Sequence, residues 1–469
     1  MNQRSAESPT VAVVGGGLAG LAAGCALSAA GFRVTLFERR RFLGGRASSY
    51  QHPGTGEIVD NCQHVLLGCC TNLIEFYQRT AVADKIRWYD RLTFLEPGGR
   101  ASVIGASFLP APFHTAPSFL AADCLGLRDK LAIARAMLAL MPPPPGDMEE
   151  SFLDWLKRHH QTALGIERFW KTVLVSALNE DLERIAVPYA AQVFRESFLK
   201  SAEAGRMGVP SVPLTELYSA AGNYIRAHNG DVQLRAAIDS FRAEPSQVSL
   251  SINGQEFGFD YLLLAVPFDQ LDRLLPNVAD AQPLRESLTQ FEPSPITGIH
   301  LWFDREISEL DHAVLLDRTI QWMFHKSRLL DRERHTAASG SYIELVVSSS
   351  KSLVGESRPQ IIDLALNETR EFFPAAMAAN LVKATVIKEV HATYSPRPGI
   401  DRYRPGNATV WPRVFLAGDW TATDWPATME GAVRSGYRAA QALSHAAGQS
   451  DATYLVPNLP PSGLMRLFR

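Results

Sequence analysis

A short apolar run followed by three spaced glycines near the start of the chain most constrains its fold. Residues 11–14 form a continuously apolar run that predicts a buried parallel strand. Gly15, Gly17 and Gly20 follow with the spacing G-x-G-x-x-G, and residues 18–30 predict an alanine-rich helix. The first glycine permits a sharp turn, the second lets the backbone approach a diphosphate, and the third lets the helix pack on the strand. The free N–H groups at the start of the helix then bind the diphosphate.

A second strand and its terminal carboxylate strengthen this interpretation. Residues 32–37 predict a strand that ends on Glu38, about 20 residues after the glycines, where a carboxylate binds ribose hydroxyls. We assign the adjacent Arg39 to the same site. Residues 11–32 are also uncharged over about the length of a membrane span. The density of glycines and the strand with its acidic end argue against that alternative.

A Gly-Gly-Arg triplet at residues 44–46 follows the second strand. Alone it would predict only a turn and a solvated cation. After a nucleotide-binding strand it resembles the G-G-R signature of the amine oxidase and carotenoid desaturase flavoproteins. The resemblance implies that Gly45 and Arg46 approach the diphosphate, where a cation is favourable, and that the cofactor is FAD rather than NAD.

A second motif near the end of the chain complements the first. Residues 414–417 predict a strand that delivers Gly418 and Asp419 to the cofactor. The short carboxylate of Asp419 suits a hydrogen bond to the ribityl or diphosphate region. Thr428 and Met429 begin a helix whose free N–H groups would face the pyrimidine edge of the flavin, where negative charge develops on reduction.

Size, charge and cysteine content narrow the remaining classes. The chain has 469 residues, enough for two domains, and its net charge of −3 argues against a nucleic-acid partner. The first ten residues are polar and lack an apolar signal core, so we expect a cytoplasmic location. The cysteines form no C-x-x-C pair, and we expect reduced, mostly buried thiols and no metal site. They are Cys25, Cys62, Cys69, Cys70 and Cys124.

The order of the segments predicts a discontinuous fold. We expect an α/β protein with a Rossmann-like FAD-binding domain of the amine oxidase/phytoene desaturase type and a discontinuous α+β substrate domain. The superfamily resemblance implies that residues 232–234 return to the nucleotide-binding sheet and that the backbone of Ile238 pairs with adenine. We assign residues 1–75, 215–290 and 405–445 to the FAD domain. Residues 76–214 and 291–404 would form the substrate domain.

Residues 102–141 are apolar but are interrupted by prolines and by basic residues. One interpretation is a cap helix packed on the substrate domain. The other is a surface that sits on a membrane and admits a lipid. The basic, apolar residues 464–469 have the same character. We therefore predict peripheral association with the inner face of the membrane.

The motif near the end of the chain distinguishes between branches of the superfamily. Asp419, residues 429–432 (Met-Glu-Gly-Ala) and residues 435–436 (Ser-Gly) resemble the carotenoid desaturases. Monoamine oxidases carry an aromatic residue where this chain has Thr428. They also carry a lysine in the strand that corresponds to residues 297–303, whereas the nearest downstream lysine here is Lys326. Amine oxidation is therefore disfavoured.

Three further segments resemble the squalene-associated FAD-dependent proteins, the hydroxysqualene dehydroxylases of bacterial hopanoid pathways. They are residues 60–68, 212–218 and 417–421, with one departure at Cys62, where glycine is expected. The resemblance implies a long-chain isoprenoid substrate, hydroxysqualene, which is reduced to squalene by hydride from reduced FAD. The electron donor stays unknown, because the chain shows no second glycine motif for NADPH.

Reductive dehydroxylation needs an acid that protonates the leaving hydroxyl. His64 is our first candidate, because its segment follows the G-G-R loop and histidine titrates near neutrality. Asp60 and Asp424 are alternatives, although Asp424 could simply cap the following helix. Two other functions stay open: a carotenoid desaturase of the phytoene type, which runs in the opposite redox direction, and a non-catalytic lipid-binding flavoprotein.

Overall fold

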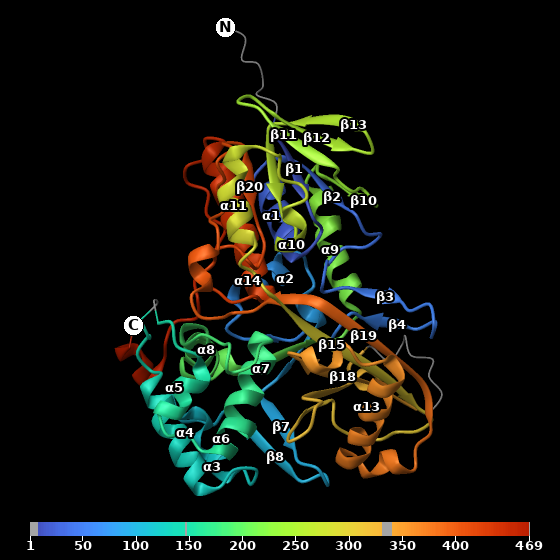
Figure 1. Cartoon of the computed structure of the whole chain (residues 1–469), viewed down its shortest axis with the longest axis vertical. Coiled ribbons are helices and arrows are strands. Elements are labelled where there is room, and N and C mark those ends of the chain that lie inside the picture. Colours follow the sequence, from blue (N-terminus) through green and yellow to red (C-terminus); the bar gives the residue numbers. More distant parts are fainter. Residues whose placement is uncertain (1–7, 146–147, 331–339, 469) are drawn as a thin grey trace.

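The computed structural model describes residues 8–145, 148–330 and 340–468. Figure 1 shows a part built of strands and helices from both ends of the chain at the top, a group of helices at the lower left and a large sheet at the lower right. Both predicted strand–turn–helix units are present, and the mixed α/β class is confirmed.

A parallel five-stranded sheet forms the centre of the upper part, in the order β10-β2-β1-β14-β20. Its strands are β1 (Thr10–Val14), β2 (Arg33–Glu38), β10 (Asp231–Leu234), β14 (Tyr261–Leu264) and β20 (Val414–Leu416). Alternate residues of β1 face opposite layers. Val11 and Val13 pack in the cluster that includes α1, whereas Ala12 and Val14 share a cluster with the three-stranded sheet.

Helices cover the first of these faces. They are α1 (Leu18–Ala29), α9 (Leu214–Ala227) and α14 (Met429–Ala446), joined by α2 (Thr71–Arg79). The three-stranded sheet consists of β11 (Ser240–Ala243), β12 (Val248–Ile252) and β13 (Gln255–Phe259). Short helices α10 (Phe268–Leu271) and α11 (Gln282–Leu288) follow β14.

The lower sheet has seven strands in the order β19-β15-β18-β17-β16-β7-β8. They are β7 (Arg91–Leu95), β8 (Ala101–Gly105), β15 (Pro293–Phe303), β16 (His312–Leu315), β17 (Trp322–His325), β18 (Ser341–Ser348) and β19 (Leu381–Tyr394). Helix α13 (Arg358–Phe372) packs against one face through an apolar cluster. The opposite face forms part of the wall of the main cavity.

The helical group lies beside this sheet. It contains α3 (Ala116–Ala121), α4 (Leu127–Ala139), α5 (Phe152–Arg158), α6 (Ala163–Gly165), α7 (Thr172–Leu178) and α8 (Val187–Val193), with π-helical segments η3 (Ile166–Lys171) and η4 (Phe194–Leu199). Short strands β3 (Ser49–Gln51), β4 (Ile58–Asp60), β5 (Leu66–Leu67), β6 (Ile86–Tyr89) and β9 (Met207–Pro210) connect the parts. Among the described residues, no helix is both long and apolar enough to cross a membrane.

Candidate active site

One cavity of about 670 Å³ extends from the carboxyl ends of the five-stranded sheet to the face of the seven-stranded sheet opposite α13. Ligands of open parallel sheets bind at this edge. Eleven of the twelve residues that we predicted to bind the cofactor line its wall: Gly15, Gly17, Glu38, Arg39, Gly45, Arg46, Ile238, Gly418, Asp419, Thr428 and Met429. Only Gly20 lies outside it.

The three glycines of the first motif have separate structural roles. Gly15 has a φ of +114°, and a Cβ there would lie 2.3 Å from the carbonyl oxygen of Ala265. A Cβ on Gly20 would lie 1.9 Å from the carbonyl oxygen of Gly15, so the helix packs tightly on the turn. A Cβ on Gly17 would meet only the Cα of Gly45, at 4.0 Å. Gly17 therefore leaves its backbone open to the cavity, as a bound diphosphate requires.

The carboxylate of Glu38 closes the turn from the end of β2. Its two oxygens accept hydrogen bonds from the backbone N–H groups of Gly16 and Arg40, each at 2.7 Å. The side chain is buried and lies in the wall of the cavity. A carboxylate is thus fixed where the ribose of a dinucleotide would bind.

An ion pair joins the Gly-Gly-Arg triplet to the motif near the end of the chain. Arg46 Nη2 lies 2.7 Å from Asp419 Oδ1, and Nη1 donates to the carbonyl oxygen of Ala392 at 2.6 Å. Burial alone would lower the pKa of Arg46, but the charge of Asp419 more than offsets this and raises that pKa. The pair therefore holds a permanent cation in the cavity wall, beside the glycines of the first motif.

The start of α14 also faces the cavity. Thr428 accepts a hydrogen bond from the backbone N–H of Gly431 at 3.1 Å and so caps the helix. The Tyr218 hydroxyl donates to the sulfur of Met429 at 3.3 Å, and Gly418 N–H donates to Ser435 Oγ at 2.7 Å. These bonds fix the conformation of this part of the cavity wall.

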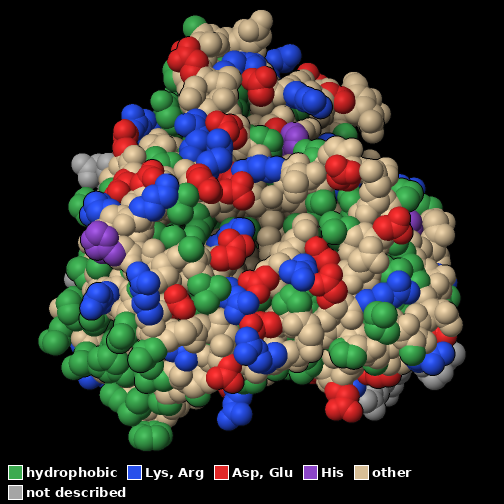
Figure 2. Space-filling model, turned by 60° about the horizontal axis from the view of Figure 1, so that its bottom comes forward, with side chains coloured by type: hydrophobic (Ala, Val, Ile, Leu, Met, Phe, Trp, Pro, Cys, Tyr) green, Lys and Arg blue, Asp and Glu red, His purple; other side chains and the backbone are tan. Residues whose placement is uncertain are grey.

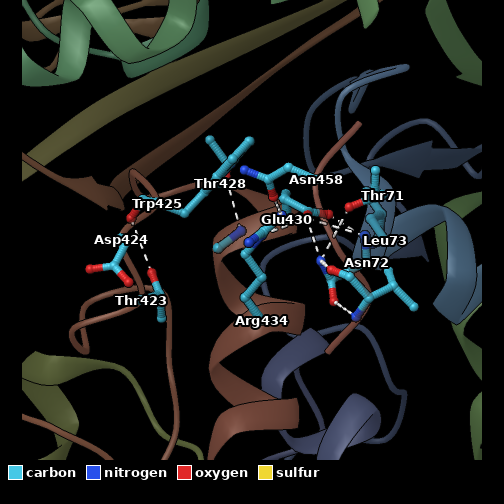
Figure 3. A network of polar contacts seen from close by, with 12 residues as sticks. Thr71, Asn72, Leu73, Thr423, Asp424, Trp425, Thr428, Glu430, Arg434 and Asn458 are labelled. Carbon is cyan, nitrogen blue, oxygen red and sulfur yellow. Dashed lines mark hydrogen bonds and ion pairs between the residues drawn. The ribbon is translucent and has the colours of Figure 1, made fainter. Parts of the chain in front are cut away.

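Glu430 is a structural residue that the sequence did not reveal, although it belongs to the Met-Glu-Gly motif. It is almost fully buried, and its oxygens accept hydrogen bonds from the backbone N–H groups of Asn72 and Leu73, at 3.1 and 2.7 Å. Arg434 donates to it at 2.7 Å (Figure 3). A carboxylate from α14 thereby caps the N-terminus of α2 and locks the two helices together.

His64 lies in the cavity wall, as predicted. Its Nδ1 is 2.7 Å from the carbonyl oxygen of Cys62 and therefore donates, since a carbonyl oxygen can only accept. Burial lowers the pKa of His64, which favours the neutral ring with a free lone pair on Nε2. At neutral pH this ring is better suited to accept a proton than to supply one.

The two aspartates that we named as alternative acids lie elsewhere. The carboxylate of Asp424 is 84% exposed and pairs with Arg438 at 2.6 Å, so it points to solvent rather than into the cavity. Asp60 is buried behind the wall, 2.6 Å from Lys326 Nζ. Burial would raise the pKa of Asp60, but Lys326 and further hydrogen bonds lower it. Asp60 therefore stays ionised and is poorly suited to donate a proton.

The far end of the cavity is apolar. Its lining residues there include Leu92, Phe94, Val173, Phe198, Ile296, Val314, Trp322, Phe324 and Val346. Cys62, the departure from the expected glycine, packs in a cluster with Phe324 and Val346 and so adds to this apolar wall. All five cysteines are free thiols, and four of them are buried. An apolar chain can therefore occupy this end without leaving polar groups unsatisfied.

The residues present fit FAD. The cavity combines an open glycine turn at a helix start, a fixed carboxylate at the end of β2 and an arginine beside the turn. A second helix start, capped by Thr428, borders the same space. The chemistry of this donor set matches a ribose, a diphosphate and a ring that gains negative charge on reduction.

Known proteins resemble this chain over most of its length. The family model for flavin containing amine oxidoreductase matches residues 18–444. The 15-cis-phytoene desaturase of Synechococcus elongatus is 28% identical over 92% of this chain and 95% of its own length. The zeta-carotene desaturase of Synechocystis is 25% identical over 92% of this chain and 96% of its own length.

Solved structures are similar in fold. An oxidoreductase from Methanosarcina mazei superposes with a TM-score of 0.70 and 16% identity, covering 91% of this chain and 98% of that one. Putrescine oxidase bound to putrescine gives a TM-score of 0.69 and 15% identity, covering 94% and 98%. The chain therefore belongs to the flavin containing amine oxidoreductase family and is a FAD-dependent oxidoreductase.

Proposed function

We propose that the protein transfers hydride between FAD and a long-chain isoprenoid. The observation that carries this proposal is one continuous cavity with a nucleotide-binding end and an apolar end. FAD, when bound, supplies or accepts the hydride. The apolar wall would orient the chain and exclude water from the reacting carbon.

Desaturation is the first candidate for the direction of transfer. The relatives named above are phytoene and zeta-carotene desaturases that match over almost the whole chain. Loss of hydride and a proton from a hydrocarbon needs a base rather than an acid. The neutral ring of His64, with Nδ1 donating to Cys62, suits that role.

Hydroxysqualene dehydroxylation is the second candidate, and a specific observation favours it. The three segments that resemble the dehydroxylases converge around the cavity. Asp60 accepts a hydrogen bond from the backbone N–H of Leu214 at 3.2 Å, which joins the first segment to the second. His64 from the first segment and Asp419 from the third both line the wall. In this reaction His64 would have to be protonated before it could release the hydroxyl as water, and an electron donor would have to reduce FAD.

One anaerobic experiment distinguishes the candidates. Photoreduced enzyme is mixed with hydroxysqualene, oxidised enzyme is mixed with phytoene, and both extracts are analysed by mass spectrometry. Squalene with flavin reoxidation supports dehydroxylation, whereas a phytoene product two hydrogens lighter with flavin bleaching supports desaturation. Absence of both products, with FAD bound, would leave the non-catalytic lipid-binding alternative.

We further propose that the protein binds the inner face of the membrane peripherally. Large apolar side chains are exposed on one end of the molecule: Phe108 (97%), Leu120 (60%), Leu127 (69%), Leu131 (54%) and Leu467 (78%). Figure 2 shows hydrophobic side chains gathered at this end, over α3, α4 and the C-terminal segment. Arg128, Arg135 and Arg466 are exposed on the same elements and would attract anionic headgroups.

The proposed domain division follows the two main sheets. Four of the five strands of the parallel sheet lie within residues 1–75 and 215–290, and β20 lies within 405–445. The strands of the seven-stranded sheet lie within 76–214 and 291–404. We infer that the cavity is the junction of these two domains.

A further inference from the structure

A buried cluster of charged side chains lies behind the cavity wall. Lys326 Nζ is 2.6 Å from Asp60 Oδ2, 2.7 Å from Gln63 Oε1 and 3.5 Å from Glu344 Oε2. The side chains of Lys326, Asp60 and Glu344 are 2%, 4% and 0% exposed. The segment that contributes Asp60 and Gln63 continues directly into His64, which lines the cavity.

The seven-stranded sheet brings Glu344 to this position. Glu344 and Val346 project from the same face of β18, and Val346 lines the cavity. Gly298 on the neighbouring strand β15 lies against the Asn61–Cys62 backbone. A Cβ on Gly298 would lie 3.4 Å from the carbonyl oxygen of Asn61. The cluster is therefore one layer behind the segment 61–64 that faces the cavity.

This arrangement is expensive for stability. Removing three charged groups from water lowers the free energy of unfolding unless each is well paired, and apolar residues of similar volume in their place are often at least as stabilising. Asp60 is well paired, because Ser49 and Leu214 also donate to it. Among the described residues, neither oxygen of Glu344 has a hydrogen-bond partner of ordinary geometry. In the part of the chain that the structure describes, the carboxylate is paired only by the long 3.5 Å contact with Lys326, and a buried carboxylate so weakly paired calls for a role other than packing.

We propose that Lys326 and Glu344 are positioning residues for the flavin reaction: Lys326 holds the Asn61–His64 segment through Asp60 and Gln63, and Glu344 makes the flavin reduction potential depend on pH. This proposal rests on the proposed function only in assuming that FAD binds in this cavity. It requires neither direction of hydride transfer.

The protonation states of Lys326, Asp60 and Glu344 determine the net charge of the cluster. Burial raises the pKa of Glu344 to about 7, with Lys326 partly offsetting the increase. Burial alone would lower the pKa of Lys326, but Asp60 and Glu344 raise it, so the ammonium persists. Asp60 stays ionised. The cluster is thus neutral below pH 7 and carries one negative charge above it.

The other titratable groups that face Glu344 do not change this balance. Burial lowers the pKa of His300 on β15 to about 3, and burial raises the pKa of Cys62 and of Tyr342 well above their usual values. All three are therefore neutral between pH 5 and 8. Because reduction gives the flavin ring negative charge, ionised Glu344 should make reduction less favourable.

The test measures the FAD midpoint potential of the holoenzyme at pH 6 and pH 8, without substrate. Glu344→Gln keeps the volume and removes the charge. We expect equal potentials for wild type and E344Q at pH 6. At pH 8 the equilibrium for flavin reduction should be about tenfold less favourable in wild type than in E344Q. This difference corresponds to a midpoint potential about 30 mV lower for a two-electron couple. The proposal would be overturned if wild type and E344Q had equal potentials at both pH values, or if they differed by the same amount at both.

Lysine variants test the positioning role. Lys326→Met should lower the potential at both pH values and change the flavin absorbance spectrum, while Lys326→Arg should restore most of the wild-type behaviour. Lys130→Met is the matched control, because Lys130 is also buried and donates to the carbonyl oxygen of Leu120 in the distant helical group. A wild-type spectrum and potential in K326M would remove Lys326 from the proposal.

A measurement on wild-type enzyme covers the case in which E344Q does not fold. If reduction and protonation are coupled, reducing the flavin at pH 7 must raise the proton occupancy of Glu344. Infrared difference spectra should then show a carboxylic acid band that grows on reduction. Absence of this band overturns the proposal. Because neither readout uses substrate, failure here is distinguishable from failure of the proposed function.

Discussion

Arg46 and Asp419 form a 2.7 Å ion pair across 373 positions of the chain. The arginine follows β2 and the aspartate follows β20, so the pair joins the loop after β2 to the loop after β20. Both side chains line the cavity at its nucleotide-binding end. Cofactor binding and the joining of these two loops therefore depend on the same contact.

Breaking this pair should weaken FAD binding. In Asp419→Asn the partly buried Arg46 loses its charged partner, and charge-assisted hydrogen bonds contribute about 1.5–3 kcal/mol. We expect FAD affinity to fall at least about tenfold, measured by flavin fluorescence titration of the apoprotein. Arg438→Met, which breaks the exposed pair with Asp424, is the control and should keep its FAD. An unchanged affinity in D419N would contradict the role assigned to the pair.

Substitutions at Gly17 and Gly15 should affect FAD binding and folding separately. Gly17→Val places a side chain in open space beside Gly45, in an extended backbone conformation that valine adopts easily. We expect a colourless protein that keeps the melting temperature of the wild-type apoprotein. In Gly15→Val the side chain would collide with the Ala265 carbonyl at a φ of +114°, so this variant should fail to fold. A yellow G17V preparation would show that the diphosphate does not approach this glycine.

The protonation state of His64 predicts opposite pH profiles for the two reactions. Because its pKa is lowered, the ring is neutral at pH 7 and gains a proton only below its ordinary value of 6.5. Desaturation should therefore slow on acidification, whereas dehydroxylation should accelerate. His64→Ala should slow either reaction by about 10²-fold, the usual scale for acid–base catalysis, and leave FAD content intact. Stopped-flow absorbance of the flavin measures both, and a full rate in H64A would remove His64 from the mechanism.

Glu344 should make stability fall as pH rises. Its pKa is raised from 4.5 to about 7 in the folded protein, so its stabilising contribution is complete below pH 4.5 and is lost as pH approaches 7. Relative to Glu344→Gln, wild type should lose roughly 3 kcal/mol of unfolding free energy between pH 4.5 and 7. Urea unfolding at several pH values tests this. The exposed Glu371→Gln should show no such trend, and parallel curves for E344Q and wild type would contradict it.

The exposed apolar end should control membrane binding. Leu127→Asp combined with Leu131→Asp removes two side chains that would each contribute about 1.5–3 kcal/mol on burial in lipid. We expect binding to anionic vesicles, measured by co-sedimentation, to fall at least about tenfold, and salt to release the wild type. Val410→Asp combined with Met377→Asp changes exposed apolar residues elsewhere and is the control. Wild-type binding by the first pair would exclude this surface.

Sequence reasoning succeeded where chemistry depends on local spacing. The first glycine motif, β2 with Glu38 and the helix that starts at Met429 are each defined by a few adjacent residues, and the structure has all of them. Helix α1 ends at Ala29, one residue before the predicted end, and α14 begins at Met429 as predicted. Local signals of this kind are readable because each residue type meets a backbone requirement of its own.

Long-range pairing was not readable. Lys326 contacts Asp60, which lies 266 positions earlier in the chain, and Glu430 caps α2, which lies at least 357 positions earlier. No local sequence pattern predicts either contact. Asp424 illustrates the converse. Its neighbours suggested a residue at the flavin, but a left-handed backbone conformation and Arg438 direct its carboxylate to solvent. Burial decides the role of a carboxylate, and burial is a property of the assembled fold.

The strand order β10-β2-β1-β14-β20 also has a consequence during synthesis. Strand β20 and helix α14 leave the ribosome after the other four strands of this sheet, yet they supply one edge of the sheet, Asp419 and the Glu430 cap. Until then β14 has an unpaired edge, and the emerging chain lacks the cavity-lining residues Gly418, Asp419, Thr428 and Met429. Such edges invite wrong pairing, and contacts this distant in sequence form slowly. FAD should therefore be captured only after β20 and α14 have been synthesised, which would make cofactor supply a limit on the yield of folded protein.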